Sequence, residues 1–199
     1  MTAGPTPRVA ALVLAAGRST RMGPHNKLLA DVGSMPMVRR VVLTALSSRA
    51  EPVIVVTGYQ PGRIETALAD LGITFVDNPD FARGLSTSLR RGVAALPADV
   101  DGVVVCLGDM PHVASATLDR LIAAFDPVEG RAICVPSRNG KRGNPVLFAR
   151  QFFAEMQAVS GDAGARALIG AHPEAVHEVA TADDGILFDI DDPQALTGE

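Results

Sequence analysis

The sequence of 199 residues contains no tryptophan, and aromatic residues make up only 4% of it. Alanine, valine and leucine must therefore provide most of the core packing. No apolar stretch reaches the ~18 residues that a membrane-spanning helix needs, and the first residues lack the apolar region of a signal peptide. We therefore expect a cytoplasmic protein without a membrane partner.

Long basic runs are also missing, and the net charge is −4. A nucleic acid is therefore not expected as a partner, and any small anion must be bound by a local group of cations. The chain has only two cysteines, Cys106 and Cys134, and each lies in an apolar run. This pattern predicts two buried thiols in a reducing compartment and gives no support to a disulfide.

Short apolar or β-branched runs alternate with segments of helical apolar spacing, which is typical of βαβ units around a mainly parallel sheet. Strands are predicted at 9–14, 53–57, 73–76, 103–107 and 132–135. Helices are predicted at 37–45, 63–71, 85–96 and 116–125, the last of them capped by Ser115. Beyond residue 140 the pattern loosens, with weaker strand candidates at 145–148, 176–179 and 186–188 and helices near 150–158 and 162–170.

No repeat, low-complexity linker or change of composition divides the chain. The sequence therefore predicts a flexible N-terminal tail over 1–7 and a single domain over 8–199. In such a sheet a ligand binds beyond the carboxyl ends of the strands, at a topological switch point.

One such strand end leads into a loop that is rich in positive charge. The stretch AALVLAAGRSTRMGPHNKLL (10–29) passes from a buried strand into Gly17, followed by Arg18, Arg21 and Lys27. Glycine permits a tight turn and lets backbone amides approach a phosphate closely, and the three cations supply charge. The loop is therefore a candidate phosphate site, and a solvated basic loop is the alternative interpretation.

Two common phosphate loops are excluded here by their spacing. The dinucleotide fingerprint needs glycine two positions after Gly17, where this chain has Ser19, and the P-loop needs its second glycine where this chain has Met22.

Two acidic segments are candidate metal ligands. Asp109 follows the apolar run VVVCL at the carboxyl end of a predicted central strand, and carboxylates are suitable ligands for Mg²⁺. In FDIDDP, Asp189 and Asp191 lie on either side of Ile190 and would share a face of an extended segment. The alternatives are that Asp109 only closes a turn before Pro111, and that FDIDDP supplies a helix cap and one exposed acid.

Six motifs together resemble the MobA-like nucleotidyltransferases, and more closely the branch of molybdenum cofactor cytidylyltransferases often called MocA. The motifs are LAAGRSTRMGPHNKLL, GLSTSLRRG, CLGDMP, RGNPVLF, GDAGAR and DIDDPQAL, and they span nearly the whole chain. The guanylyl branch typically has LAGG in place of LAAG. The resemblance implies an α/β, three-layer, Rossmann-like nucleotidyltransferase fold whose central sheet is mixed but mostly parallel.

The resemblance also implies roles for individual residues. The catalytic residues would be Arg18, Arg21, Lys27 and Asp109. The nucleotide would contact Leu14, Ala15, Ala16, Gly17, Arg18, Lys27, Gly84, Ser86, Ser88 and Gly108. The acceptor substrate would lie near Gly143, Asn144, Pro145, Asp162 and Arg166. Magnesium would be bound by Asp109 with Asp191 or Asp189, of which Asp191 is favoured.

Several of these residues also have simple structural interpretations. Without the resemblance, the segment 86–88 predicts a helix N-cap, 143–145 a turn, and 161–162 the entry to a helix.

The implied reaction transfers CMP from CTP to the terminal phosphate of the molybdopterin cofactor and releases pyrophosphate. The product is molybdopterin cytosine dinucleotide, and a recipient molybdoenzyme is a further expected partner. The alternatives are guanylyl transfer, a sugar-phosphate acceptor, an NAD(P)-linked oxidoreductase, and a non-catalytic nucleotide-binding protein. The missing G-x-G-x-x-G pattern and the acidic metal candidates disfavour the oxidoreductase.

Overall fold

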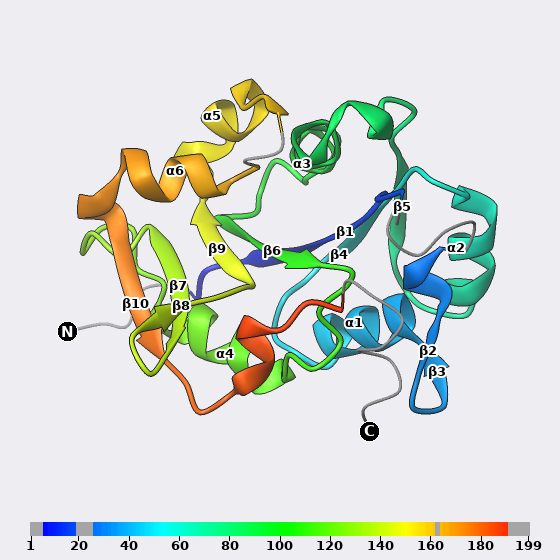
Figure 1. The fold of residues 1–199 in the computed structure, drawn as a ribbon. Coiled ribbons are helices and arrows are strands. Elements are labelled where there is room, and N and C mark those ends of the chain that lie inside the picture. The colour runs from blue at the N-terminus through cyan, green and yellow to red at the C-terminus, as the bar shows by residue number, and fades with distance from the viewer. Residues whose placement is uncertain (1–5, 19–25, 162–163, 191–199) are drawn as a thin grey trace.

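A central eight-stranded sheet organises the fold, and helices cover both of its faces (Figure 1). The computed structural model describes residues 6–18, 26–161 and 164–190. In spatial order the strands are β10 (Val176–Ala180), β7 (Ile133–Arg138), β9 (Val146–Ala149), β6 (Gly102–Leu107), β1 (Val9–Ala15), β4 (Val53–Thr57) and β5 (Thr74–Asp77), and β8 (Lys141–Arg142) pairs with β7. A separate small ribbon pairs β2 (Asp31–Val32) with β3 (Met35–Pro36).

Most strand pairs in the central sheet are parallel. β1 runs parallel to both β4 and β6, β4 is parallel to β5, and β7 is parallel to β10. β9 is antiparallel to its two neighbours, β6 and β7. The sheet is therefore mixed but mostly parallel, and the predicted fold class is confirmed. Every residue of β1 is buried, as expected for a central strand that is covered on both faces.

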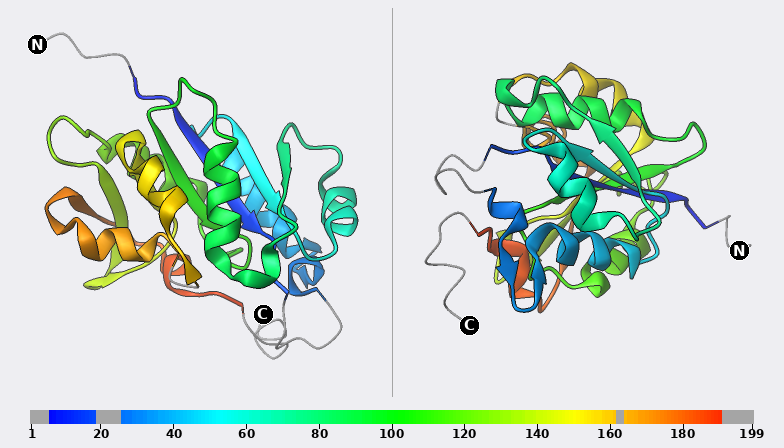
Figure 2. Two further views of the ribbon diagram at one scale, coloured as in Figure 1. Left: turned by 90° about the horizontal axis from the view of Figure 1, so that it is seen from above. Right: turned by 90° about the vertical axis from the view of Figure 1, so that its right-hand side faces the viewer.

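The helices form the two outer layers (Figure 2). One face of the sheet carries α1 (Met37–Leu46) and α4 (Ser115–Ala124), with α2 (Pro61–Leu68) packed beside α1. The other face carries α3 (Leu85–Ala94), α5 (Phe153–Ala158) and α6 (Arg166–Ala171). Short 3-10 helices are η2 (Lys27–Leu29), η3 (Phe81–Arg83), η4 (Arg150–Phe152), η6 (Pro173–Ala175) and η7 (Asp184–Leu187).

The predicted strands and helices are present, except at 186–188, and most of them have shifted ends. The strand predicted there is wrong, because Ile186 belongs to the 3-10 helix η7. The Asp183 side chain caps this helix by accepting a hydrogen bond from the backbone N–H of Gly185 at 2.9 Å. A side-chain cap closes the local turn, so the apolar alternation in this segment does not produce a strand.

Two predicted helix caps are also wrong. α4 begins at Ser115 itself, and its N-cap is Ala114, whose N–H donates to Asp183 Oδ2 at 2.9 Å. α3 begins at Leu85 with Gly84 as its N-cap, so the hydroxyl residues at 86–88 lie inside the helix and are buried.

Within the described residues, each helix is too short or too polar to cross a membrane. Of the predicted tail, only residues 6 and 7 are described, so the tail and the single-domain organisation stay predictions.

Candidate functional site

Two adjoining cavities lie between α3 and the sheet, at the carboxyl ends of β1 and β6. The first has a volume of about 550 Å³ and is lined by the loop after β1, by η3 and by the start of α3. It contains Arg18, Lys27 and Arg83, and we call it the cationic cavity. The second, the apolar cavity, has a volume of about 530 Å³ and is lined mainly by aliphatic side chains of the sheet, α3 and α6. Both lie where open parallel sheets bind ligands.

Asn26 fixes the position of Lys27 at the far end of the loop. The Asn26 side chain is 3% exposed, and its Oδ1 accepts a hydrogen bond from Leu28 N at 3.1 Å, which caps η2. Its Nδ2 donates to the carbonyl oxygen of Tyr59, just beyond β4, at 3.3 Å. Lys27 is thereby held as the first residue of η2, where it lines the cationic cavity.

Lys27 and Asp109 form an ion pair in the cationic cavity, although 82 positions separate them in the sequence. The Lys27 Nζ atom lies 2.8 Å from Asp109 Oδ2, and the two side chains are 13% and 23% exposed. Partial burial weakens solvent screening, so this pair interacts more strongly than an ion pair on the surface. A cation and a carboxylate are thus held side by side at the end of β6.

The C-terminal segment returns to this site, a point that the sequence left open. The backbone N–H of Ile190 donates to the carbonyl oxygen of Asp109 at 2.9 Å, and Asn144 N donates to Ile186 O at 3.0 Å. Asp189 is exposed and lies directly before this contact. Within the described residues, no three His, Cys, Asp or Glu side chains form a ready metal cluster, and Asp191 lies outside those residues.

The structure sorts the predicted site residues into four groups. The cationic cavity is lined by Leu14, Ala16, Gly17, Arg18, Lys27, Gly84, Ser88 and Asp109. The apolar cavity is lined by Gly143, Asn144 and Arg166, and also by Leu14. Neither cavity includes Ala15, Ser86, Gly108, Pro145 or Asp189 among its lining residues. Outside the described residues lie Arg21, Asp162 and Asp191.

The apolar cavity has aliphatic walls and a polar rim. Side chains such as Leu89, Val105 and Val146 form its walls, while Arg142 and Arg166 are among its polar lining residues. The Arg142 guanidinium is paired with Glu178, with Nε 2.8 Å from Oε1. The cavity is therefore suited to a ligand with a flat or apolar body and an anionic group.

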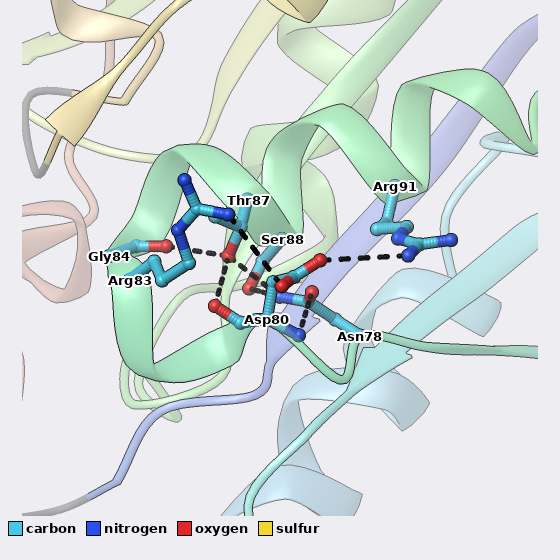
Figure 3. A network of polar contacts seen from close by, with 7 residues as sticks. All are labelled: Asn78, Asp80, Arg83, Gly84, Thr87, Ser88 and Arg91. Atoms are coloured by element: carbon cyan, nitrogen blue, oxygen red, sulfur yellow. Dashed lines mark hydrogen bonds and ion pairs between the residues drawn. The ribbon is translucent and has the colours of Figure 1, made fainter.

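The sequence analysis missed several residues of the cationic cavity. Phe81 and Arg83 line it, and Asn78, which is not among the lining residues, donates a hydrogen bond to the hydroxyl of Ser88 (Figure 3). Asn78 directly follows β5, so the rule that singled out Asp109, a polar residue at the carboxyl end of a parallel strand, could also have found it.

The cysteines take no part in this site. Both are free and buried, and burial raises the pKa of each thiol, Cys106 and Cys134, to about 12. Because the thiolate is the reactive form, neither residue is a nucleophile near neutral pH.

Comparison with known proteins identifies relatives along the whole chain. A family model described as MobA-like NTP transferase domain matches residues 11–176. Purine catabolism protein PucB of Bacillus subtilis is 30% identical over 202 residues, covering 95% of this chain and 94% of PucB. Bifunctional protein GlmU of Kineococcus radiotolerans is 38% identical over 138 residues, but the match covers 68% of this chain and only 28% of GlmU.

A solved structure also resembles the chain over its whole length. The crystal structure of Rv0371c from Mycobacterium tuberculosis H37Rv matches with a TM-score of 0.86 at 29% identity, covering 98% of this chain and 100% of that one. Another Rv0371c structure, a complex with manganese, matches with a TM-score of 0.76 at 27% identity, covering 89% of each chain.

Proposed function

The chain belongs to the MobA-like NTP transferase family, and from this premise we propose that it transfers CMP from CTP to the terminal phosphate of the molybdopterin cofactor. Nucleotidyl transfer is the activity of the family as a whole. The choice of CTP and of molybdopterin depends on the resemblance of LAAG, GLSTSLR and GNPV to the cytidylyltransferase branch. The dinucleotide product would pass to a recipient molybdoenzyme.

The observation that carries the proposal is the pair of adjoining cavities with different chemical character. They share Leu14, Leu85 and Leu107, so ligands in the two would meet at the carboxyl ends of β1 and β6. Transfer of a nucleotidyl group requires two bound substrates in contact, because positioning provides much of the rate acceleration. A triphosphate is suited to the cationic cavity and the acceptor to the apolar one.

The walls of the apolar cavity favour a pterin over a sugar. A sugar phosphate presents hydroxyl groups on all sides, and each would need a polar partner in the protein. The lining is mainly aliphatic, with Gly143, Asn144 and two arginines as its polar part. A planar ring can pack against the aliphatic walls, hydrogen-bond at its edge and present its phosphate to an arginine.

Arg18 and Lys27 provide positive charge where the reaction builds negative charge. The attacking phosphate of the acceptor is already an anion near neutral pH, so no strong general base is needed. The barrier arises from the approach of two anions and from charge on the departing pyrophosphate. Fixed cations in a partly enclosed site stabilise that charge without reorganising. We assign this role to Arg18 and Lys27, and to Arg21 by the resemblance.

Asp109 and its surroundings fit a magnesium ion. The Asp109 carboxylate lines the cationic cavity and is partly exposed, and the backbone bond from Ile190 brings the acidic C-terminal segment beside it. Mg²⁺ is commonly bound by one or two carboxylates together with substrate phosphates, so a complete protein cage is not required. We propose that Asp109 holds the ion with Asp191 or Asp189. The manganese complex of Rv0371c supports a divalent cation. When bound, the ion would neutralise phosphate charge.

Pyrophosphate release tests the proposal directly. CTP, GTP, ATP and UTP would each be supplied with Mg²⁺ and freshly prepared molybdenum cofactor. We expect release with CTP, and only when the cofactor is present. Release with GTP would place the protein in the guanylyl branch. No release with any nucleotide, after the cofactor is shown to be intact, would refute the assignment of the acceptor.

A further inference from the structure

Asn78 is a fully buried amide at the junction of β5, η3 and α3 (Figure 3). Its backbone N–H donates to the carbonyl oxygen of Thr57 at 2.9 Å, which ties it to the end of β4. Its side-chain Oδ1 accepts a hydrogen bond from Asp80 N at 3.1 Å. Because a backbone N–H can only donate, this bond identifies the oxygen of the amide and directs Nδ2 toward α3.

The Asn78 Nδ2 group donates to the hydroxyls of two consecutive residues in the first turn of α3. It lies 2.9 Å from Thr87 Oγ1 and 3.0 Å from Ser88 Oγ (Figure 3). Thr87 in turn donates to the carbonyl oxygen of Gly84 at 2.8 Å. The proton of the Thr87 hydroxyl is therefore used within the protein.

The hydroxyl proton of Ser88 has no such acceptor within the described part of the chain. Ser88 Oγ accepts from Asn78, which leaves its own O–H to donate elsewhere. The residue is 4% exposed and lines the cationic cavity. A buried donor without a partner is unfavourable, and an acceptor on a bound ligand would satisfy it.

We infer that Asn78 is a positioning residue that holds Ser88 as a hydrogen-bond donor to the nucleoside part of the bound nucleotide. The inference rests on the proposed function, because it takes the cationic cavity as the nucleotide site. Phosphates are expected near Arg18 and Lys27, whereas Ser88 lies on α3 beside Phe81, where a base or ribose oxygen or a ring nitrogen could accept the proton.

Reversing the hydrogen bond tests this inference. In Asn78→Asp the side chain keeps its size, but both oxygens of its carboxylate accept hydrogen bonds. The Ser88 hydroxyl would therefore donate to the carboxylate and no longer into the cavity. Ser88→Ala removes the donor directly. Thr117→Val is the matched control, because Thr117 is also a buried hydroxyl near the start of a helix, bonded to Asp183 Oδ2 at 2.6 Å on the opposite face of the sheet.

The readout is nucleotide affinity, measured by isothermal titration calorimetry without the acceptor. All four nucleotides are offered to the unaltered protein, and the variants are compared with the nucleotide that binds most tightly. For Ser88→Ala we expect a Kd about 3–10-fold higher, the effect of losing one hydrogen bond. For Asn78→Asp we expect a loss of similar size, because the Ser88 hydroxyl would then donate to the carboxylate and no longer to the ligand. The double variant should lose less than the product of the two single losses.

Each outcome separates this inference from the proposed function. If the unaltered protein binds none of the nucleotides, the proposed function fails and the inference with it. If it binds one and Ser88→Ala binds equally well, only the inference is overturned, and this holds even if Asn78→Asp does not fold. Losses that multiply in the double variant would show independent roles and overturn the positioning by Asn78. Thr117→Val should unfold at lower temperature with an unchanged Kd.

Discussion

Replacing Gly143 by alanine should displace the backbone of the C-terminal segment at Ile186 and destabilise the protein. Gly143 lies beneath η7, and a Cβ atom on it would lie 2.2 Å from the carbonyl oxygen of Ile186 and 2.8 Å from its carbonyl carbon. The same oxygen accepts the hydrogen bond from Asn144 N at 3.0 Å. The added methyl group therefore collides with backbone on a segment that is already held in place, and no side-chain rotation relieves the contact.

The structure sets the size of the effect. Cβ atoms essentially never approach another atom closer than 3.0 Å, so the Ile186 carbonyl must move by roughly 1 Å. Overpacking of this kind costs about 1–3 kcal/mol, and weakening the Asn144 hydrogen bond adds about 1 kcal/mol. We expect Gly143→Ala to lower the free energy of unfolding by about 2–4 kcal/mol. With a urea m-value of about 2 kcal/mol/M, the midpoint falls by about 1–2 M.

Urea unfolding followed by circular dichroism measures this shift, and Gly62→Ala is its control. Gly62 lies in α2, and a Cβ there would meet no atom of the described residues within 4 Å. Alanine at that position should leave the midpoint unchanged or raise it, because alanine favours a helix by up to about 1 kcal/mol. A midpoint for Gly143→Ala equal to that of the unaltered protein would refute the packing argument.

Three further outcomes are expected. Lys27→Ala should lower turnover by ~10²-fold or more in the pyrophosphate assay, the scale of losing one electrostatic stabiliser, and near-normal turnover would contradict its assignment. Gly17→Ala should unfold within about 0.5 kcal/mol of the unaltered protein, because a Cβ there meets no described atom within 4 Å, yet bind CTP more weakly; equal affinity in calorimetry would contradict a close backbone approach. The hydrogen bond to Glu155 raises the pKa of His172 above 6.5, so the stabilisation from this pair is fully present below pH 6.5 and is lost as the pH rises through the raised pKa. His172→Gln should therefore lower the melting temperature at acidic pH, and the two proteins should converge at alkaline pH. A difference in melting temperature that is independent of pH would contradict this linkage.

The central part of the fold could be predicted from the sequence because its signals are local. A strand such as β1 is apolar at every position, and this pattern reflects burial on both faces. The strand expected at 186–188 failed for an equally local reason, the side-chain cap of Asp183 on Gly185. The hydroxyls at 86–88 suit a helix N-cap, but they lie inside α3, where Asn78, the residue after β5, donates hydrogen bonds to two of them. That contact joins two elements, and no local pattern contains it.

The return of the C-terminal segment to Asp109 is the part of the site hardest to predict, because its contacts use backbone atoms. The bond from Ile190 N to Asp109 O could be made by almost any residue, so the side chains involved carry no signal. Two glycines leave a visible trace of this packing: a Cβ on Gly143 would collide with the backbone of Ile186, and a Cβ on Gly185 would collide with the backbone of His112. Gly17 has open space among the described residues instead, so packing does not explain it and a ligand could. A glycine in a motif therefore has two meanings, room for another segment or room for a ligand, and only the space around its missing Cβ distinguishes them.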